Sequence, residues 1–140
     1  MSMVAPQTIT ANFTIPASAT TNGGRLTGAG FGAATPRLDG GDSIQVVVTW
    51  GGNNAPGQLT AYCIFSPAQG STQTGPSPFM NGNNYLCYVS QTATANGQRY
   101  TFPSFTIPQG TAAGNYELTI VVDNSGMQWS EDPEFDTTGN

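Results

Sequence analysis

Hydrophobic and polar side chains alternate along this chain in short runs separated by clusters of Gly, Pro and Asn. The alternation has a period of two, which is the spacing of one face of a β-strand. No stretch shows helical spacing over three turns. The pattern predicts about seven short strands. They cover residues 9–15, 44–50, 59–65, 85–89, 100–105, 116–122 and 127–129.

Short strands with turn signals between them are typical of a β-sandwich. The segment FTIPQGTAAGNYELTIVVD, Phe105–Asp123, resembles the strand–turn–strand ending of many bacterial Ig-like domains. The resemblance implies an Ig-like topology. We therefore expect an all-β fold, an antiparallel Ig-like β-sandwich of about seven strands. Ig-like domains host many functions, so the resemblance implies none in particular.

The length of 140 residues suits one domain. We expect a single β-sandwich domain over residues 1–140, with an extended N-terminal segment at 1–7 and an acidic C-terminal tail at 130–140. Segment 1–7 has no strand signals of its own, and such a segment can add a strand to the open edge of a neighbouring sheet. Two long loops, at about 17–38 and 66–84, are rich in Gly, Thr, Ser and Pro.

Charge is scarce, and this excludes several classes of function. The chain has three basic and eight acidic residues, no Lys and no His, and a formal net charge of −5. Three Arg cannot supply the row of cations that a phosphate backbone requires, so we expect no nucleic-acid binding. No apolar run approaches the roughly 20 residues that span a bilayer, so we expect no membrane insertion. Residues 1–7 also lack the basic and apolar regions of a signal peptide.

The same composition argues against catalysis. Without His, the usual catalytic triads and most zinc sites cannot form, and without Lys there is no Schiff-base chemistry. Paired carboxylates remain possible, but nothing in the sequence positions a pair across a cleft. We therefore expect that the chain is not an enzyme.

Cys63 and Cys87 are the two cysteines of the chain, and each lies in a predicted strand. Their even number and matching positions predict a disulfide. A bond between them would close a loop of about 25 residues. By restricting the unfolded chain it would stabilise the folded state by roughly 3 kcal/mol. The alternative is two buried free thiols, because unpaired cysteine is among the most buried residue types.

The acidic tail is a candidate calcium site. Calcium binds several oxygen ligands, including carboxylates, and four of the eight acidic residues lie within six positions of each other. An aspartate at the end of the long strand can join them. The candidate ligands are Asp123, Glu131, Asp132, Glu134 and Asp136. The alternative is a solvated acidic terminus that only aids solubility.

Aromatic side chains are candidates for stacking on a sugar. Tyr62 and Tyr88 have the opposite phase to the cysteines, so we expect an exposed pair on the outer face of neighbouring strands. Trp129 lies in an irregular polar segment and is a third candidate, whereas Trp50 continues a core alternation. The alternative for the tyrosines is cross-strand packing that stabilises the sheet.

These features favour a non-catalytic structural or adhesive module of an extracellular, cell-surface or virion assembly. Few charges and abundant Thr, Asn, Gly and Ser suit a protein whose backbone and amide groups make its contacts. The expected partners are further copies of the chain or other protein subunits. The alternative function is a small carbohydrate-binding module that recognises glycans, assisted by calcium at the acidic tail.

Overall fold

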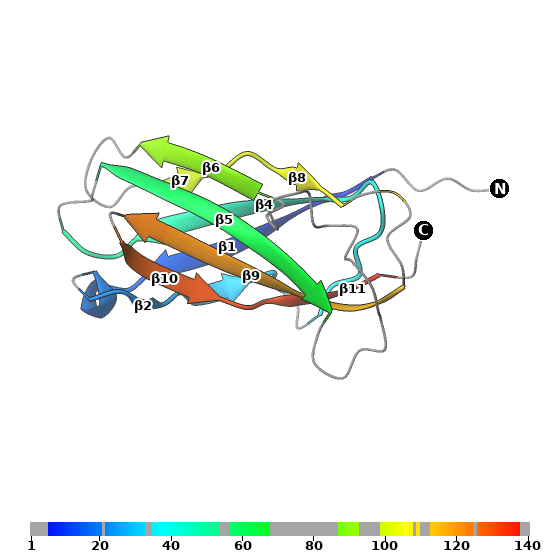
Figure 1. Cartoon of the computed structure of the whole chain (residues 1–140), viewed down its shortest axis with the longest axis horizontal. Coiled ribbons are helices and arrows are strands. Elements are labelled where there is room, and N and C mark those ends of the chain that lie inside the picture. The colour runs from blue at the N-terminus through cyan, green and yellow to red at the C-terminus, as the bar shows by residue number, and fades with distance from the viewer. Residues whose placement is uncertain are drawn as a thin grey trace.

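A computed structural model describes residues 6–20, 22–32, 35–53, 57–67, 87–92, 99–107, 109, 113–124 and 126–137, with side chains omitted at 63–67 and 87–92. These residues form two β-sheets packed face to face, with one short 3-10 helix (Figure 1). The elements are β1 (Thr8–Ile15), η1 (Ala17–Ala19), β2 (Gly24–Arg25), β3 (Thr27–Gly30), β4 (Ser43–Trp50), β5 (Gln58–Pro67), β6 (Cys87–Thr92), β7 (Arg99–Thr101), β8 (Phe105–Thr106), β9 (Gly114–Asn124), β10 (Met127–Glu131) and β11 (Glu134–Thr137).

The first sheet has five strands in the order β3-β1-β4-β7, with β8 also paired to β4. Strands β1 and β4 run parallel, in register from Thr8↔Ser43 to Ile15↔Trp50. A parallel pair needs a crossover connection rather than a tight turn. The long segment between these two strands supplies that connection.

The second sheet has six strands in the order β2-β10-β9-β5-β6, with β11 also paired to β9. Strand β9 is the longest, and it pairs with β5 along one side. On its other side it pairs first with β11 and then with β10, which are separated only by Asp132 and Pro133. Strands β10 and β11 therefore continue each other along the same side of β9.

The all-β sandwich is confirmed, and a strand lies in each predicted range, with residues 85 and 86 of the fourth range outside the described residues. The run at 100–105 is divided at Pro103 into β7 and β8. The purely antiparallel arrangement was wrong, because β1–β4 and β2–β10 are parallel pairs and both sheets are mixed. Side-chain alternation has the same period in parallel and antiparallel strands, so the sequence pattern cannot distinguish them.

The sequence missed β2, β3 and β11. The first two lie inside the loop predicted at 17–38 and are short and glycine-containing. Between them the chain passes from one sheet to the other at Leu26, which is fully buried and donates its backbone N–H to Ser130 O at 2.9 Å. Gly23 precedes this crossing with φ +75°, and a Cβ there would lie 2.6 Å from Gln128 O. Glycine is thus required where the chain approaches β10.

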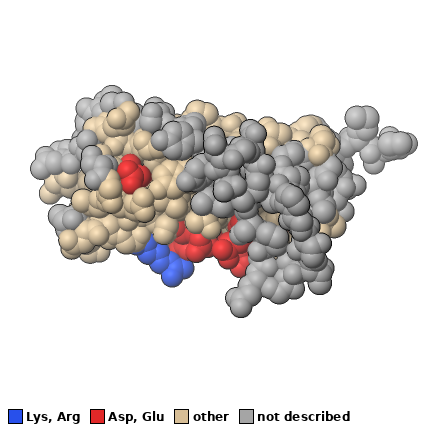
Figure 2. Space-filling model, in the orientation of Figure 1, with Lys and Arg blue, Asp and Glu red and all other residues tan. Residues whose placement is uncertain are grey.

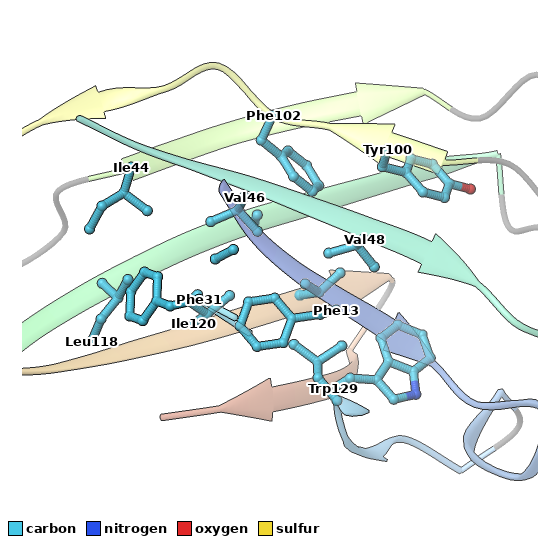
Figure 3. Close-up of a cluster of buried hydrophobic side chains, with 14 of the residues drawn as sticks. Phe13, Phe31, Ile44, Val46, Val48, Tyr100, Phe102, Leu118, Ile120 and Trp129 are labelled. Carbon is cyan, nitrogen blue, oxygen red and sulfur yellow. The ribbon is translucent and has the colours of Figure 1, made fainter. Parts of the chain in front are cut away.

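The core lies between the sheets and draws side chains from both (Figure 3). The rings of Trp50 and Trp129 pack edge to face, with centroids 5.6 Å apart at 87°. Tyr116 and Phe135, which are register partners of β9 and β11, stack with centroids 5.6 Å apart. The two aromatic pairs anchor the β10–β11 segment in the core.

The end of the N-terminal segment is fixed to its own domain. Gln7 donates its backbone N–H to Asp42 Oδ1 at 3.0 Å and its side-chain amide to Arg37 O at 3.1 Å. Asp42 Oδ2 also accepts the backbone N–H of Asp39 at 2.9 Å. The predicted extended segment at 1–7 is therefore held at residue 7, and residues 1–5 lie outside the described residues.

Candidate functional site

The two cysteines are brought directly opposite each other. Cys63 of β5 and Cys87 of β6 are register partners in an antiparallel pair. Such partners have Cα atoms about 4.5 to 5.5 Å apart, within the range of about 4.4 to 6.8 Å that disulfides use. Their side chains lie outside the described residues, so the disulfide stays a prediction that the backbone register permits.

The predicted acidic tail is largely strand. Residues 130 and 131 complete β10, and β11 follows at Glu134–Thr137 with Phe135 fully buried and Thr137 buried. Strand β11 begins directly after Asp132 and Pro133. Because β11 contains Glu134 and Asp136, the sequence indicated an acidic tail here rather than a strand. The even spacing of Trp129, Phe135 and Thr137 was the available signal, because residues an even number of positions apart share a strand face.

The five proposed calcium ligands do not form one cluster. Asp123 lies six residues along β9 from Glu117, the register partner of Glu134, so about 20 Å of strand separates it from β11. Glu131 is held by Arg25, which donates from Nε to Oε2 at 2.8 Å and from Nη2 to Oε1 at 3.0 Å. Asp136 Oδ1 accepts a hydrogen bond from the Asn115 amide at 2.8 Å.

All eight acidic residues are among the described residues, and within that part of the chain no three Asp, Glu, His or Cys are grouped to hold a metal ion. The calcium site stays a prediction. Figure 2 shows acidic atoms at two separate places on the visible face, one of them beside the basic atoms. The hydrogen bond from Arg25 holds the pKa of the Glu131 carboxyl below its usual range.

Glu117 is an acidic residue of β9 that was not among the calcium ligands predicted from the sequence. It lies opposite Glu134 in the β9–β11 register. Partial burial raises the pKa of the Glu117 carboxyl, and the negative charges of Asp132 and Glu134 raise it further. Burial and these neighbouring charges therefore oppose the ionisation of Glu117 in the folded chain.

We expect Glu117→Gln to raise the melting temperature at pH 7 and to change it little at pH 3. A carboxyl whose pKa is higher in the folded than in the unfolded state binds its proton more tightly when folded. The ionised group thus opposes folding above its folded pKa, and this opposition disappears as the pH falls below the unfolded pKa. Thermal unfolding of both proteins across pH 3–7 measures the effect, and an equal shift at both ends would contradict the repulsion.

The aromatic candidates separate into two groups. Tyr62 is partly exposed on β5 and is the register partner of Tyr88 on β6, as the phase of the sequence predicted. Gln128 Nε2 donates to the Tyr62 hydroxyl at 2.8 Å. Trp129 was wrongly predicted to be exposed. It is only 1% exposed, and its Nε1–H donates to Ala19 O at 2.6 Å.

A feature that sequence reasoning missed is the outer face of the five-stranded sheet. Its residues alternate with core residues such as Phe13 and Val48, so they share the side of the sheet away from the core. We call it the Thr-rich face. It consists of Thr8, Thr10, Asn12, Thr14, Thr27, Ser43, Gln45, Val47, Thr49, Arg99, Thr101 and Thr106. Arg99 is the only charged residue among them.

Neighbouring strands place the polar side chains of this face in rows. One row joins Thr27, Thr14 and Thr49 across β3, β1 and β4. Another row places Ser43 beside Thr106, with their hydroxyl oxygens 3.0 Å apart. These rows depend on the parallel register of β1 and β4, which the sequence pattern does not specify.

No family model matches the chain, and no curated protein matches it. Among solved structures, an uncharacterized protein from Bacillus anthracis str. Ames is 17% identical with a TM-score of 0.34, covering 75% of this chain and 78% of that one. Reduced auracyanin from the photosynthetic bacterium Roseiflexus castenholzii is 12% identical with a TM-score of 0.37, covering 98% and 99%. Auracyanin B is 12% identical with a TM-score of 0.35, covering 99% and 93%. Such low scores and identities support no statement about what this chain binds or does.

Proposed function

We propose that the chain is a non-catalytic structural or adhesive module of an extracellular or virion assembly. We infer that it associates with further copies of itself through the Thr-rich face. The observation that carries this proposal is the distribution of charge. The Thr-rich face has one charged residue, whereas the outer side of the six-stranded sheet has acidic residues on β9 and β11 and Arg25 on β2.

Burying the Thr-rich face requires little desolvation of charge. Removing an ionised carboxylate from water is far more costly than removing a hydroxyl that regains a hydrogen bond. The central parts of protein interfaces are accordingly depleted in charged residues. At the middle of this face, Val47 lies between Asn12 and Thr101 in the register and is only 7% exposed. Val47 is therefore already covered, and hydroxyl and amide groups form most of the accessible surface of this face.

The net charge favours this face over its opposite as the contact between copies. Each copy has a formal charge of −5, so two copies repel unless their acidic groups are kept apart. Contact through the Thr-rich faces places the six-stranded sheets on the outside of the pair. Contact through the other faces would bring carboxylates such as Glu117, Asp123 and Glu134 together.

The test compares one substitution on each face. Thr101→Glu introduces a carboxylate beside Val47 on the Thr-rich face, and Thr119→Glu introduces the same charge on the outer side of the six-stranded sheet. Sedimentation velocity of the wild-type chain should show association that increases with concentration. We expect Thr101→Glu to weaken it at least about tenfold, because an unpaired charge in an interface is unfavourable by a few kcal/mol.

Thr119→Glu is the matched control, since it adds the same side chain to a strand of the same protein. We expect its association to equal that of the wild-type chain. A wild-type chain that stays monomeric at millimolar concentration would contradict the proposal. Equal weakening by both substitutions would also contradict it, because the effect would then come from net charge alone.

A further inference from the structure

A line of register partners crosses the outer side of the six-stranded sheet. The register joins Tyr88, Tyr62, Val121 and Ser130 across β6, β5, β9 and β10. We call these four residues the aromatic strip. Neighbouring strands are about 4.8 Å apart, so the part from Tyr88 to Val121 spans about 10 Å.

A row of polar residues runs alongside the aromatic strip. It joins Ser90, Thr60, Asp123 and Gln128 on the same four strands. Gln128 is exposed and donates from Nε2 to the Tyr62 hydroxyl at 2.8 Å, which ties the row to the strip. Asp123 Oδ1 accepts the Gly126 backbone N–H at 3.4 Å. The Tyr62 ring and the hydrogen-bonding groups of Asp123 and Gln128 thus lie on the same side of the sheet.

We propose that the aromatic strip and its polar row bind an uncharged glycan chain. A sugar ring presents C–H groups on its faces and hydroxyl groups around its edge. Aromatic rings pack against the C–H faces of the sugar, and amide, hydroxyl and carboxylate groups form hydrogen bonds with its hydroxyl groups. Tyr62 supplies the ring, with Tyr88 at the opposite register position, while Thr60, Asp123 and Gln128 supply the polar groups. A span of about 10 Å suits a short run of sugars rather than one.

The surrounding charge selects a neutral ligand. Asp123 lies in the polar row, and Glu117, Asp132 and Glu134 interact near the opposite end of β9. The described cations on this side are both paired: Arg25 is engaged by both carboxylate oxygens of Glu131, and Arg37, the bridge partner of Asp136, contacts Asp39 Oδ2 at 3.3 Å. An anionic glycan is therefore repelled, whereas an uncharged one is not. In Figure 2 the described atoms between the two acidic places on this side are uncharged.

This site lies on the opposite sheet from the Thr-rich face and does not depend on self-association. The test is affinity electrophoresis in native gels that contain a β-glucan, xylan, galactomannan or, as the anionic comparison, alginate. The wild-type chain should be retarded by at least one of the three neutral polysaccharides and not by alginate. Tyr62→Ala should weaken that binding about tenfold, and Tyr62→Phe, which keeps the ring, should weaken it less than threefold.

Gln128→Ala provides a second variant at an exposed position that the fold tolerates, and we expect it to weaken binding about threefold. Asn53→Ala is the matched control, because it removes an exposed amide from the bend after β4, which belongs to neither proposed face. Circular dichroism verifies that each variant is folded. Three results would overturn the proposal: no retardation by any neutral polysaccharide, equal retardation of Tyr62→Ala and the wild-type chain, or stronger retardation by alginate. None of these results changes the association expected in sedimentation velocity, so either proposal can fail while the other stands.

Discussion

Replacing Trp129 by alanine should lower the free energy of unfolding by about 4 kcal/mol, because truncating a buried Trp leaves a large cavity. The side chain is 1% exposed and packs edge to face on Trp50. Its Nε1–H also satisfies the carbonyl of Ala19 at 2.6 Å. The substitution therefore removes both a core contact and the hydrogen bond that holds η1 against β10.

Urea unfolding followed by far-UV circular dichroism measures this loss. Gln128→Ala is the control, since its side chain precedes Trp129 on the same strand but is exposed. If Trp129→Ala does not fold, Trp129→Phe retains part of the core contact and should fold with lower stability. A loss below about 1 kcal/mol for Trp129→Ala would contradict the buried position, since such small values are typical of surface substitutions.

Removing the proposed disulfide should lower the melting temperature by roughly 10 °C. A closed loop of this length contributes about 3 kcal/mol, and for a domain of this size each kcal/mol shifts the melting temperature by about 3 °C. The Cys63–Cys87 pair is the last register pair of the described β5–β6 ladder. The bond would fix the first residue of the edge strand β6 to β5.

Two measurements separate this bond from two free thiols. Alkylation of the unfolded protein without reductant should label neither cysteine, and reductant should expose both. Reductant should also lower the melting temperature of the wild-type chain and leave that of a Cys63→Ala/Cys87→Ala variant unchanged. Complete labelling of freshly purified protein before reduction would show that the thiols are free.

The strand positions could be predicted because burial of one sheet face imposes a period of two on the sequence. The clean alternation at 116–122 became part of β9, and Pro103 marked the division between β7 and β8. Pairing could not be predicted, because alternation does not specify which strands are neighbours or in which direction they run. The parallel β1–β4 register and the sheet crossing at Leu26 are tertiary features.

The positions of some candidate residues were predicted correctly and those of others were not, because the sequence pattern specifies the phase of side chains within a strand but not which strands are neighbours. Tyr62 and Tyr88 are register partners as expected, since phase within each strand and the neighbouring positions of β5 and β6 agree. The acidic residues are adjacent in sequence, but a strand sends successive side chains to opposite faces. Within the described strands, Glu131 consequently pairs with Arg25, whereas Glu134 lies opposite Glu117. Local clustering in sequence was therefore a poor guide to clustering in space.

The use of the Thr-rich face as a contact between copies is tested most directly by NMR of Thr methyl groups at increasing protein concentration. Thr14, Thr49 and Thr101 report on that face, while Thr60 and Thr119 report on the opposite sheet of the same molecule. Between about 10 μM and 1 mM, a span that covers typical weak protein contacts, we predict that signals of the first group shift and signals of the second do not. Unchanged spectra, or shifts confined to Thr60 and Thr119, would contradict this use of the face.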